Sequence, residues 1–354
     1  MKLEEIRKRI DKIDNEILSL LNQRAEEVRG IVHLKEKRNL NIFSPEREAS
    51  ILRRLNKLNK GPLKKEDIEI IFKEILSVCR AIKVILNIGY LGPEGTFTHL
   101  AAVKKFGKKA NFVPCDSIRE VFESVEKRRL DYGVVPIENS IEGVVSYTLD
   151  MFFESDLKIC AEITLEIEHS LLVSQENKGK IERIYSNPQV FAQCREWLFK
   201  NYSQVELVPC ASTAKAAQLA RKHPQSGCIG SKILADLYKL KVVASGIEDR
   251  GSNVTRFLVI SLTDSVPSGD DKTSVLFSIR DKVGALYEVL ASFKKWGINL
   301  TKIESRPSKR KPWEYYFFVD FCNHRQEENV KKVLKELEKS CIFLKILGSY
   351  PRES

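Results

Sequence analysis

The first 85 residues carry apolar side chains at intervals of three and four, the spacing of an amphipathic helix. These positions include Ile6, Ile10, Ile13, Ile17, Leu20, Val28 and Ile31. No glycine or proline interrupts the series before Gly30, so the pattern predicts one helix running roughly from Leu3 to Lys37.

Two shorter helices follow the long one. Ser44 before Pro45 predicts a helix start, with an N-cap residue and then proline at the first helical position, and Gly61-Pro62 ends that helix. The third helix carries Ile68, Ile71, Phe72, Ile75, Leu76 and Cys79. One long helix and two short ones would leave much of the long apolar stripe uncovered, so we expect a dimer.

The pattern changes near Asn87, where short apolar runs begin to alternate with helical stretches. The runs are Ile88–Leu91, Tyr132–Val135, Ser170–Val173, Val205–Val208, Gly227–Gly230 and Phe257–Ser261. This alternation predicts an α/β architecture with mainly parallel sheets, either as one domain or as two lobes with a cleft between them.

The last part of the chain has a third pattern. Residues 264–272 contain Pro267, Ser268 and Gly269 among polar neighbours and are typical of a linker. The predicted elements after them are strand Ser274–Ile279, helix Ala285–Lys295, strands Leu300–Ser305 and Tyr315–Phe321, helix Glu327–Lys339 and strand Phe343–Ser349. This β-α-β-β-α-β order is ferredoxin-like. We therefore expect an all-α domain over residues 1–86, a two-lobed α/β domain over 87–263 and an α+β domain over 272–354.

Composition places the chain among ordinary globular proteins, because 43% of its 354 residues are hydrophobic. No apolar run approaches the roughly 20 residues that span a bilayer, and the charged N-terminus lacks the apolar stretch of a signal peptide. We expect a cytoplasmic protein with no membrane partner. The eight cysteines are scattered, with no C-x-x-C pair, so we expect no metal site and no redox dithiol.

The formal net charge of +11 fits two classes of partner, nucleic acids and small anionic substrates. A nucleic-acid-binding protein usually concentrates its charge in one patch with aromatic platforms. Here Lys and Arg are interleaved with Asp and Glu along the chain, so we expect no nucleic-acid partner. A mixed solvated surface explains most of the charge, and a site for polyanionic metabolites is the next interpretation.

Arg24 interrupts the apolar face of the long helix. A buried arginine needs an anionic partner, either an acid on another helix or a bound anion. Lys35 lies 11 residues later, on nearly the same face, whereas Arg7 lies 17 residues earlier, about 25 Å away along the helix. Arg7 can therefore reach the same ligand only from an antiparallel helix of another subunit. Arg47 and Glu48, early in the second helix, complete a candidate pocket.

These residues, together with Ser44, resemble the all-helical chorismate mutases over essentially the whole helical segment. The resemblance implies the pericyclic conversion of chorismate to prephenate. That reaction needs no nucleophile, general base or cofactor, but it needs a folded substrate and positive charge beside the breaking ether bond.

By this resemblance, Arg24 and Arg47 clamp the two carboxylates of chorismate, and Lys35 faces the ether oxygen. Glu48 accepts a hydrogen bond from the ring hydroxyl, and Arg7 reaches across an intertwined dimer.

One position departs from the family pattern. The family usually places Gln or Glu on the third helix as a second contact to the ether oxygen, and here Lys83 takes that place. Either Lys83 donates the same hydrogen bond with a full charge, or it is a surface lysine outside the site.

Polar loops follow the strands of the middle segment, at residues 90–99, 136–140, 186–189, 211–214 and 230–231. The first has neither a P-loop nor a dinucleotide-binding signature. Side chains in such loops either cap helices or line a cleft for a small anion. The candidates for substrate contact are Glu138, Asn139, Ser140, Gln189, Ser212 and Thr213.

Gly-Pro-Glu-Gly-Thr-Phe at 92–97, Val-Pro-Ile-Glu-Asn-Ser at 135–140 and Asn-x-Thr-Arg-Phe at 253–257 together resemble prephenate dehydratases, over about residues 87–263. That family's fold is similar to the two-lobed periplasmic binding proteins, with the site between the lobes. The resemblance implies decarboxylation of prephenate with loss of its ring hydroxyl, giving phenylpyruvate, CO2 and water.

The same resemblance points to Thr255 as the essential hydroxyl, with Arg256 nearby as a catalytic cation. Because threonine is a weak acid, we expect Thr255 to orient the leaving hydroxyl or to relay a proton. We expect Glu138 to be an acid with a raised pKa.

In the C-terminal segment, Gly-Ala-Leu at 284–286 and Glu-Ser-Arg-Pro at 304–307 resemble the ACT domain of phenylalanine-regulated dehydratases. The resemblance implies that phenylalanine binds between two such modules and favours a less active arrangement, with about 1–3 kcal/mol of coupling. The implied contacts are Gly284, Ala285, Leu286, Asn299, Glu304, Ser305 and Arg306. We expect a homodimer or a higher even-numbered homo-oligomer.

The leading hypothesis is a bifunctional enzyme of phenylalanine biosynthesis, a chorismate mutase and prephenate dehydratase inhibited by phenylalanine. Two alternatives stay open at this point: an amino-acid-regulated dehydratase with weak or lost mutase activity, and an amino-acid-binding protein whose catalytic segments have decayed. A third, nucleic-acid binding through the basic helices, predicts a steeply salt-dependent affinity for DNA.

Overall fold

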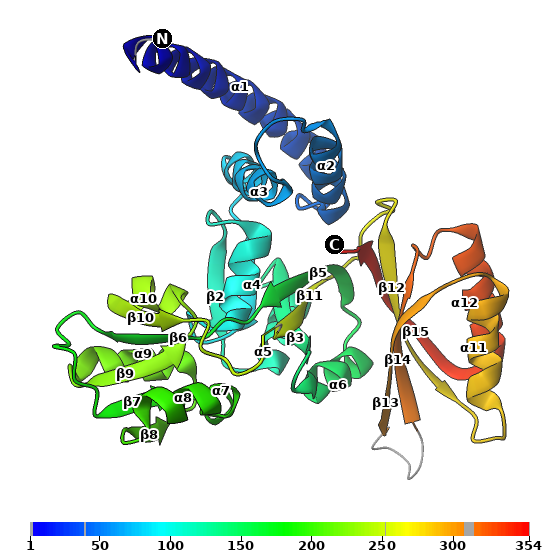
Figure 1. Cartoon of the computed structure of the whole chain (residues 1–354). Helices are drawn as coiled ribbons and strands as arrows, with labels where there is room; N and C mark the ends of the chain where they lie inside the picture. The colour runs from blue at the N-terminus through cyan, green and yellow to red at the C-terminus, as the bar shows by residue number, and fades with distance from the viewer. Residues whose placement is uncertain (1–2, 39, 252, 308–314, 354) are drawn as a thin grey trace. The chain divides into compact units, whose positions relative to one another are not determined.

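The computed structural model describes residues 3–38, 40–251, 253–307 and 315–353 (Figure 1). The chain forms two compact units, one of residues 1–87 with 103–111 and one of residues 88–102 with 112–354. Within the described ranges, no helix combines the length and the apolar character needed to cross a membrane.

The helical unit is built from α1 (Leu3–Lys37), α2 (Pro45–Leu58) and α3 (Lys65–Ala81). The predicted bounds of α1 and the predicted start of α2 are confirmed. Pro45 occupies the first helical position, where its missing N–H leaves no hydrogen bond unmade.

The apolar stripe of α1 is largely exposed within the single chain. Ile10, Ile13 and Leu20 are 51%, 54% and 63% exposed, whereas Val32, nearer the other end of the helix, is buried. Apolar area left in water costs roughly 25 cal/mol per Å², so a helix of this length normally covers its stripe. A partner chain would cover it, and dimerisation stays a prediction.

The helical unit also includes residues beyond the predicted boundary at 86. The fully buried ring of Phe106, at the end of α4 (Phe97–Phe106), packs on Phe43 with the ring centroids 4.7 Å apart. Gly107 has a φ of +73°, and a Cβ placed there would lie 2.4 Å from the side chain of Ser77. Glycine satisfies both the positive φ and the close approach.

The first sheet of the other unit has the strand order β2-β1-β3-β11-β5, with β4 paired to β3. Its strands are β1 (Asn87–Leu91), β2 (Asn111–Cys115), β3 (Tyr132–Asn139), β4 (Gly143–Val144), β5 (Lys158–Glu166) and β11 (Val254–Ser261). The helices α5 (Ile118–Glu126) and α6 (Ser146–Glu154) belong to the same lobe.

The second sheet has the order β10-β6-β9-β7-β8. Its strands are β6 (Ser170–Ser174), β7 (Arg183–Ser186), β8 (Glu206–Pro209), β9 (Ser226–Gly230) and β10 (Leu240–Ser245). The helices of this lobe are α7 (Pro188–Gln193), α8 (Arg195–Tyr202), α9 (Thr213–Lys222) and α10 (Ile233–Tyr238). Two sheets confirm the two-lobed interpretation of the middle segment.

Both sheets are mixed, so the expectation of mainly parallel sheets was wrong. β1 runs parallel to β3, and β7 runs parallel to β8 and β9. β11, however, is antiparallel to both β3 and β5, and β6 is antiparallel to both β9 and β10. The reason is the chain path: β11 returns from the second lobe and inserts between two strands of the first. Such a strand is not part of a β-α-β unit and need not run parallel.

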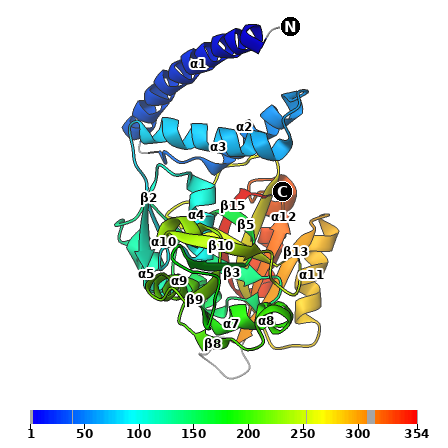
Figure 2. The same ribbon diagram turned by 60° about the vertical axis from the view of Figure 1, so that its left-hand side comes forward.

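The C-terminal segment forms an antiparallel sheet of order β13-β14-β12-β15. Its elements are β12 (Asp271–Ile279), α11 (Ala285–Lys295), β13 (Leu300–Pro307), β14 (Tyr315–Cys322), α12 (Glu328–Ser340) and β15 (Cys341–Pro351). Both helices cover one face of the sheet (Figure 1 and Figure 2). The predicted β-α-β-β-α-β order is confirmed.

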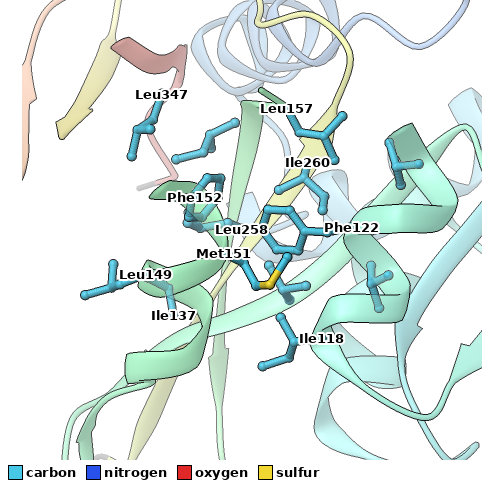
Figure 3. Packing of buried hydrophobic residues seen from close by; sticks show 14 of the residues in the cluster. Ile118, Phe122, Ile137, Leu149, Met151, Phe152, Leu157, Leu258, Ile260 and Leu347 are labelled. Carbon is cyan, nitrogen blue, oxygen red and sulfur yellow. The ribbon is translucent and has the colours of Figure 1, made fainter. Parts of the chain in front are cut away.

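The other face of this sheet shares a hydrophobic core with the first lobe (Figure 3). Leu276, Phe318 and Leu347 of the C-terminal sheet belong to the same buried cluster as Phe122 of α5 and Phe152 of α6. Burying each such side chain contributes about 1.5–3 kcal/mol. The C-terminal segment is therefore packed into its unit rather than tethered only by the linker.

Candidate functional sites

Arg24 lies partly buried on α1, at the position where the apolar stripe is interrupted. Its Nη1 atom is buried and has no hydrogen-bond partner among the described residues. A buried donor without an acceptor costs about 1–3 kcal/mol, so such a group in a native protein calls for an explanation. A ligand carboxylate would supply the missing acceptor.

Lys35 is held by the loop between α1 and α2. Its Nζ donates to the carbonyl oxygens of Asn41 at 2.9 Å and Ile42 at 3.1 Å, and also to Ser44 Oγ. Burial lowers the pKa of Lys35, although the nearby carboxylates of Glu46 and Glu48 oppose this shift. The loop therefore fixes the position of a partly desolvated ammonium group.

Glu48 is held by Arg80, a residue that the sequence reasoning missed. Arg80 Nη1 lies 2.6 Å from Glu48 Oε1, and Arg80 Nη2 donates to the carbonyl of Phe106 at 2.8 Å. The guanidinium also lies over the ring of Phe43, 5.1 Å from its centroid. A signal was present: Arg80 follows buried Leu76 by four residues and interrupts the apolar stripe of α3, as Arg24 interrupts that of α1.

The remaining cations of the predicted mutase site are more exposed. Arg7 on α1 and Arg47 on α2 have exposed side chains in the single chain. Lys83 lies two residues past the end of α3 rather than on the helix, and it forms an ion pair with Glu36 of α1. The structure thus pairs Glu48 directly with Arg80 and holds Lys35 nearby, where the charge of Glu48 acts on it. Among the described residues, no direct contact joins Arg7 or Arg47 to these three.

In the α/β unit, Thr255 lies opposite Asn139 in the antiparallel pair of β11 and β3. Asn139 Nδ2 donates to Thr255 Oγ1 at 2.8 Å and to Asn253 Oδ1 at 2.7 Å. The amide orientation is fixed because Asn139 Oδ1 accepts from the N–H groups of Ile141 and Glu142, both at 2.9 Å. Thr255 therefore accepts from Asn139 and keeps its own proton for another acceptor. Its side chain is only partly buried, so that acceptor can be a ligand.

The hydrogen-bonded chain continues into the second lobe through residues that the sequence reasoning missed. Asn253 Nδ2 donates to Gln193 Oε1 at 3.1 Å, and His169 Nε2 lies 2.8 Å from the same oxygen. Burial lowers the pKa of His169, against the hydrogen bond to Gln193, which raises it. A lone histidine and a lone glutamine carry no signal in the sequence, because only the fold brings them to Asn253.

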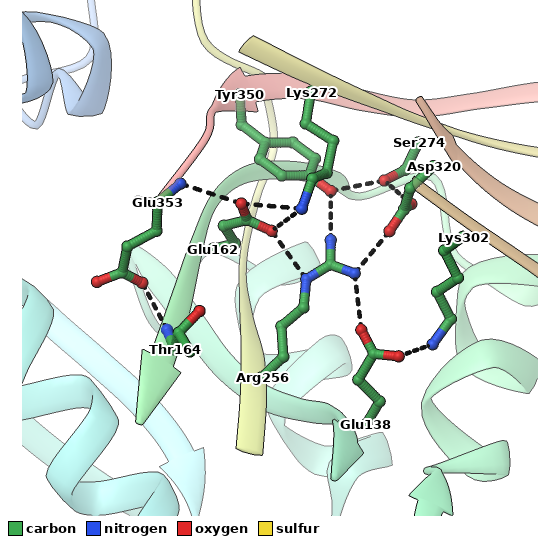
Figure 4. A network of polar contacts seen from close by, with 10 residues as sticks. All are labelled: Glu138, Glu162, Thr164, Arg256, Lys272, Ser274, Lys302, Asp320, Tyr350 and Glu353. Carbon is green, nitrogen blue, oxygen red and sulfur yellow. Dashed lines mark hydrogen bonds and ion pairs between the residues drawn. The ribbon is translucent and has the colours of Figure 1, made fainter. Parts of the chain in front are cut away.

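Arg256 does not share a site with Thr255, contrary to our expectation. Successive side chains of a strand point to opposite faces, and Arg256 faces the C-terminal sheet. Its guanidinium donates hydrogen bonds of 2.6–3.0 Å to Glu138, Glu162, Asp320 and Tyr350 (Figure 4). The Arg256 side chain is 11% exposed, so this cation holds strands together instead of facing a ligand.

Glu138 does not have the raised pKa that we expected of a proton donor. Burial alone would raise the pKa of its carboxyl group, but the hydrogen bonds and charges of Lys302 and Arg256 outweigh burial and hold this pKa below its ordinary value. Glu138 accepts from Arg256 Nη1 at 3.0 Å and from Lys302 Nζ. An ionised carboxylate of this kind accepts hydrogen bonds near neutral pH and has no proton to donate.

The other predicted loop residues have local contacts. Ser212 Oγ caps α9 by accepting a backbone N–H at 3.1 Å, and Ser140 Oγ accepts the N–H of Val254 at 2.9 Å. Thr213 is buried in the first turn of α9, and Gln189 is exposed in the first turn of α7. Their contact with a substrate stays a prediction.

The predicted effector residues lie at the start of α11 and along β13. Gly284 has a φ of +80°, which favours glycine, and Ala285 behind it is buried. Arg306 turns toward the first lobe: Nη1 donates to Ser146 Oγ at 2.8 Å, and Nη2 lies 3.4 Å from Asp150 Oδ1. The others are Leu286 and Glu304, which are partly buried, and Asn299 and Ser305, which are exposed.

Three family models match successive parts of the chain: chorismate mutase type II over residues 6–84, prephenate dehydratase over 88–265 and the ACT domain over 273–339. A bifunctional chorismate mutase/prephenate dehydratase from Aquifex aeolicus is 50% identical over 354 residues, covering 99% of this chain and 98% of the relative. The chain belongs to the bifunctional chorismate mutase/prephenate dehydratase family. The Pseudomonas aeruginosa protein of the same name is 44% identical over 356 residues, covering 99% of this chain and 98% of that relative.

A crystal structure agrees with this family assignment. Prephenate dehydratase from Arthrobacter aurescens, solved in complex with L-Phe, has a TM-score of 0.69 to this chain and 33% sequence identity, covering 75% of this chain and 90% of that chain. As a member of the family, the chain is an enzyme with two activities, chorismate mutase and prephenate dehydratase, and it carries an ACT domain.

Proposed function

We propose that Arg24, Lys35 and Arg47 hold chorismate in the helical unit, with Glu48 on its ring hydroxyl and Arg7 supplied by a second copy of the chain. The observation that carries this proposal is the buried, unpartnered Nη1 atom of Arg24. The dimer that brings Arg7 to the site would also cover the exposed apolar stripe of α1.

The mutase reaction explains why cations suffice. Chorismate rearranges by breaking a C–O bond and forming a C–C bond within one molecule, so the protein supplies geometry and charge rather than a reacting group. Clamping both carboxylates favours the folded substrate in which the reacting carbons meet. Lys35, fixed by Ser44 and two loop carbonyls, would stand beside the ether oxygen as negative charge develops there.

In the dehydratase step, we assign Thr255 to the leaving ring hydroxyl. The bond from the ring to the carboxylate breaks, CO2 departs, its electron pair enters the ring, and the C–O bond to the hydroxyl breaks. The departing oxygen needs one proton to leave as water. Because Thr255 accepts from Asn139, its own O–H is left to donate, and it can orient that oxygen or relay the proton. The proposed substrate contacts are Ser140, Gln189, Ser212 and Thr213. Asn139, which we also expected to contact the substrate, makes all of its amide hydrogen bonds within the protein, so its proposed role is to hold Thr255.

We further propose that the ACT domain binds phenylalanine between two copies of the chain and that the bound effector inhibits the dehydratase. Support comes from the relative solved with L-Phe and from the exposed Gly284 that precedes α11. The assembly is then a homodimer or a higher even-numbered oligomer. We place the enzyme in the cytoplasm.

The decisive experiment supplies the purified full-length chain with chorismate, follows prephenate and phenylpyruvate, and then adds phenylalanine. We expect both products, with phenylpyruvate formation falling after the addition. Thr255→Ala should stop the sequence at prephenate, and full dehydratase turnover in that variant would overturn the assignment of Thr255. A chain that converts prephenate but not chorismate would favour the dehydratase with lost mutase activity.

A further inference from the structure

Two cross-strand pairs lie next to each other on β3 and β11. Thr255 is opposite Asn139, and Arg256 is opposite Glu138. Because neighbouring side chains of a strand alternate between faces, the first pair points to the candidate dehydratase site and the second to the C-terminal sheet. Glu138 and Asn139 are neighbours on β3, and Thr255 and Arg256 are neighbours on β11, so one peptide unit on each strand links the two pairs. A shift of the Glu138–Arg256 pair therefore also shifts the Asn139–Thr255 pair.

The C-terminal domain reaches the second pair through Lys302 of β13. Its Nζ is paired with Glu138 Oε2, and the Lys302 side chain is 9% exposed. Figure 4 shows the Glu138 carboxylate between Arg256 on one side and Lys302 on the other. Arg256 is held in turn by Asp320 of β14, at 2.6 Å.

The charges around Arg256 balance closely. Glu138, Glu162 and Asp320 supply three negative charges, and Arg256, Lys272 and Lys302 supply three positive ones. Among these six side chains Glu138 is the most exposed, at 32%, against 12% or less for the others. The position of Glu138 therefore depends on its two cations more than on packing.

We propose that Lys302 is a positioning residue for the dehydratase reaction: it fixes Glu138 and, through the adjoining peptide unit, the Asn139–Thr255 pair. The ACT domain thereby completes the geometry of the dehydratase site without a side chain that touches the substrate. This inference rests on the proposed role of Thr255.

The test compares Lys302→Met with a matched control, Lys345→Met, in the full-length chain. Lys345 of β15 also joins the ACT domain to the first lobe, since its Nζ donates to the carbonyl of Ser155 at 2.6 Å and lies 3.3 Å from Asp156. Its side chain is 14% exposed, close to the value for Lys302, but within the described part of the chain it forms no hydrogen bond or ion pair with β3 or β11. Lys302 and Lys345 both lie outside the helical unit, so circular dichroism and thermal unfolding of each full-length variant report whether the unit that carries the substitution is folded.

We expect Lys302→Met to lower dehydratase kcat about ten- to a hundred-fold with little change in KM, because a misplaced group of this kind slows the chemical step. Lys345→Met should stay near the parent enzyme. Lys302→Arg restores the charge and should recover most of the lost kcat.

A pH profile separates positioning from packing. Glu138 faces Arg256 from β11 and Lys302 from β13, with Asp320 of β14 behind Arg256. Removing Lys302 takes away one of the two cations that lower the Glu138 pKa, so this pKa rises. Protonation would then release Glu138 at a higher pH, and the acid limb of dehydratase kcat in Lys302→Met should move to higher pH than in Lys345→Met.

Thr255→Ala, measured in parallel, distinguishes an error in the proposed dehydratase site from an error in the proposed role of Lys302. If Thr255→Ala keeps its dehydratase activity, the proposed site itself is wrong. If Thr255→Ala is inactive but Lys302→Met matches Lys345→Met in kcat and in its acid limb, the site stands and the positioning role of Lys302 is overturned.

Discussion

Arg24 and Arg256 are both partly or largely buried arginines, yet they have opposite surroundings. Arg24, in the helical unit, keeps a buried Nη1 atom without a partner among the described residues. Arg256, in the α/β unit, donates to three carboxylates and a tyrosine hydroxyl. The comparison separates a cation with an unpartnered donor, which we propose binds an anionic ligand, from a cation whose charge the protein has already neutralised.

The difference follows from what each region must do. A site for a dicarboxylate needs donors that stay open until the substrate arrives, which costs folding free energy. A joint between two sheets needs every donor satisfied, because an unpaired charge there would be costly. Sequence motifs do not distinguish the two cases, since both arginines stand beside residues that match family signatures.

The largest expected effect is that of Arg256→Met, which removes the neutralised cation. The change leaves Glu162 and Asp320 buried with fewer cations, at 2% and 0% side-chain exposure, so we expect a loss of about 3–5 kcal/mol in the free energy of unfolding. Urea unfolding of the full-length chain, followed by the fluorescence of its aromatic side chains, measures this loss.

Arg325→Met is the control for that measurement. Arg325 pairs with a single carboxylate, Asp264, at 3.0 Å, and its side chain is 37% exposed. Asp264 is 9% exposed but keeps a hydrogen bond from the N–H of Ser349 at 3.1 Å when the arginine is removed. We expect at most about 1 kcal/mol there, because solvent screens such a pair. Equal losses in the two variants would show that Arg256 has no special role in joining the sheets.

The second prediction concerns the open cation. Arg24→Met should lower mutase kcat/KM by roughly 10²–10³-fold, as expected when a preorganised charged donor is removed from a transition state. The protein should keep its stability, because no partner of Arg24 Nη1 is left unpaired. Dehydratase turnover in the same sample is the internal control, and a stability loss with unchanged mutase turnover would make Arg24 a structural cation like Arg256.

The sequence predicts the surroundings of Arg24 better than those of Arg256, and the reason is physical. Helix periodicity is local, so the bounds of α1 and the inward place of Arg24 follow from spacing alone. The contacts of Arg256 join residues 118 and 64 positions apart, and they require the register of β3 with β11 and the docking of β14. No spacing rule gives these, and the motif suggested a catalytic cation instead.

The same limit explains the error at Glu138. We expected Glu138 in a polar loop after a buried strand, whereas the structure places it within β3. Burial alone would have raised its pKa as we expected. The two cations that reverse the shift come from β11 and β13, far away in the sequence. Arg80 is the opposite case, because its inward position on α3 was readable from spacing but was overlooked.

A third prediction tests Lys83, whose surroundings are intermediate between those of Arg24 and those of Arg256. In the single chain it is paired with Glu36, and the two side chains are 34% and 41% exposed. If Lys83 serves as the second donor to the ether oxygen, Lys83→Ala should lower mutase kcat about tenfold, the value of one charged hydrogen bond. Glu36→Gln frees the lysine without removing it and should leave turnover near the parent value. Unchanged mutase turnover in Lys83→Ala would make Lys83 a surface lysine.

The smallest expected effect is a shift in a pH limb, and it concerns Lys35, an ammonium whose three donors are already held by Ser44 and two loop carbonyls. Burial lowers the pKa of this ammonium in the free enzyme, although Glu46 and Glu48 oppose the shift. Only the protonated form stabilises the ether oxygen, so mutase kcat/KM should fall as pH rises through this pKa, below the ordinary lysine value of about 10.4. Lys35→Arg should remove the basic limb, because a guanidinium stays protonated. Lys8→Arg, at an exposed position of α1, is the matched control and should leave the limb in place. A basic limb that survives in Lys35→Arg would belong to another group and would remove Lys35 from the reacting oxygen.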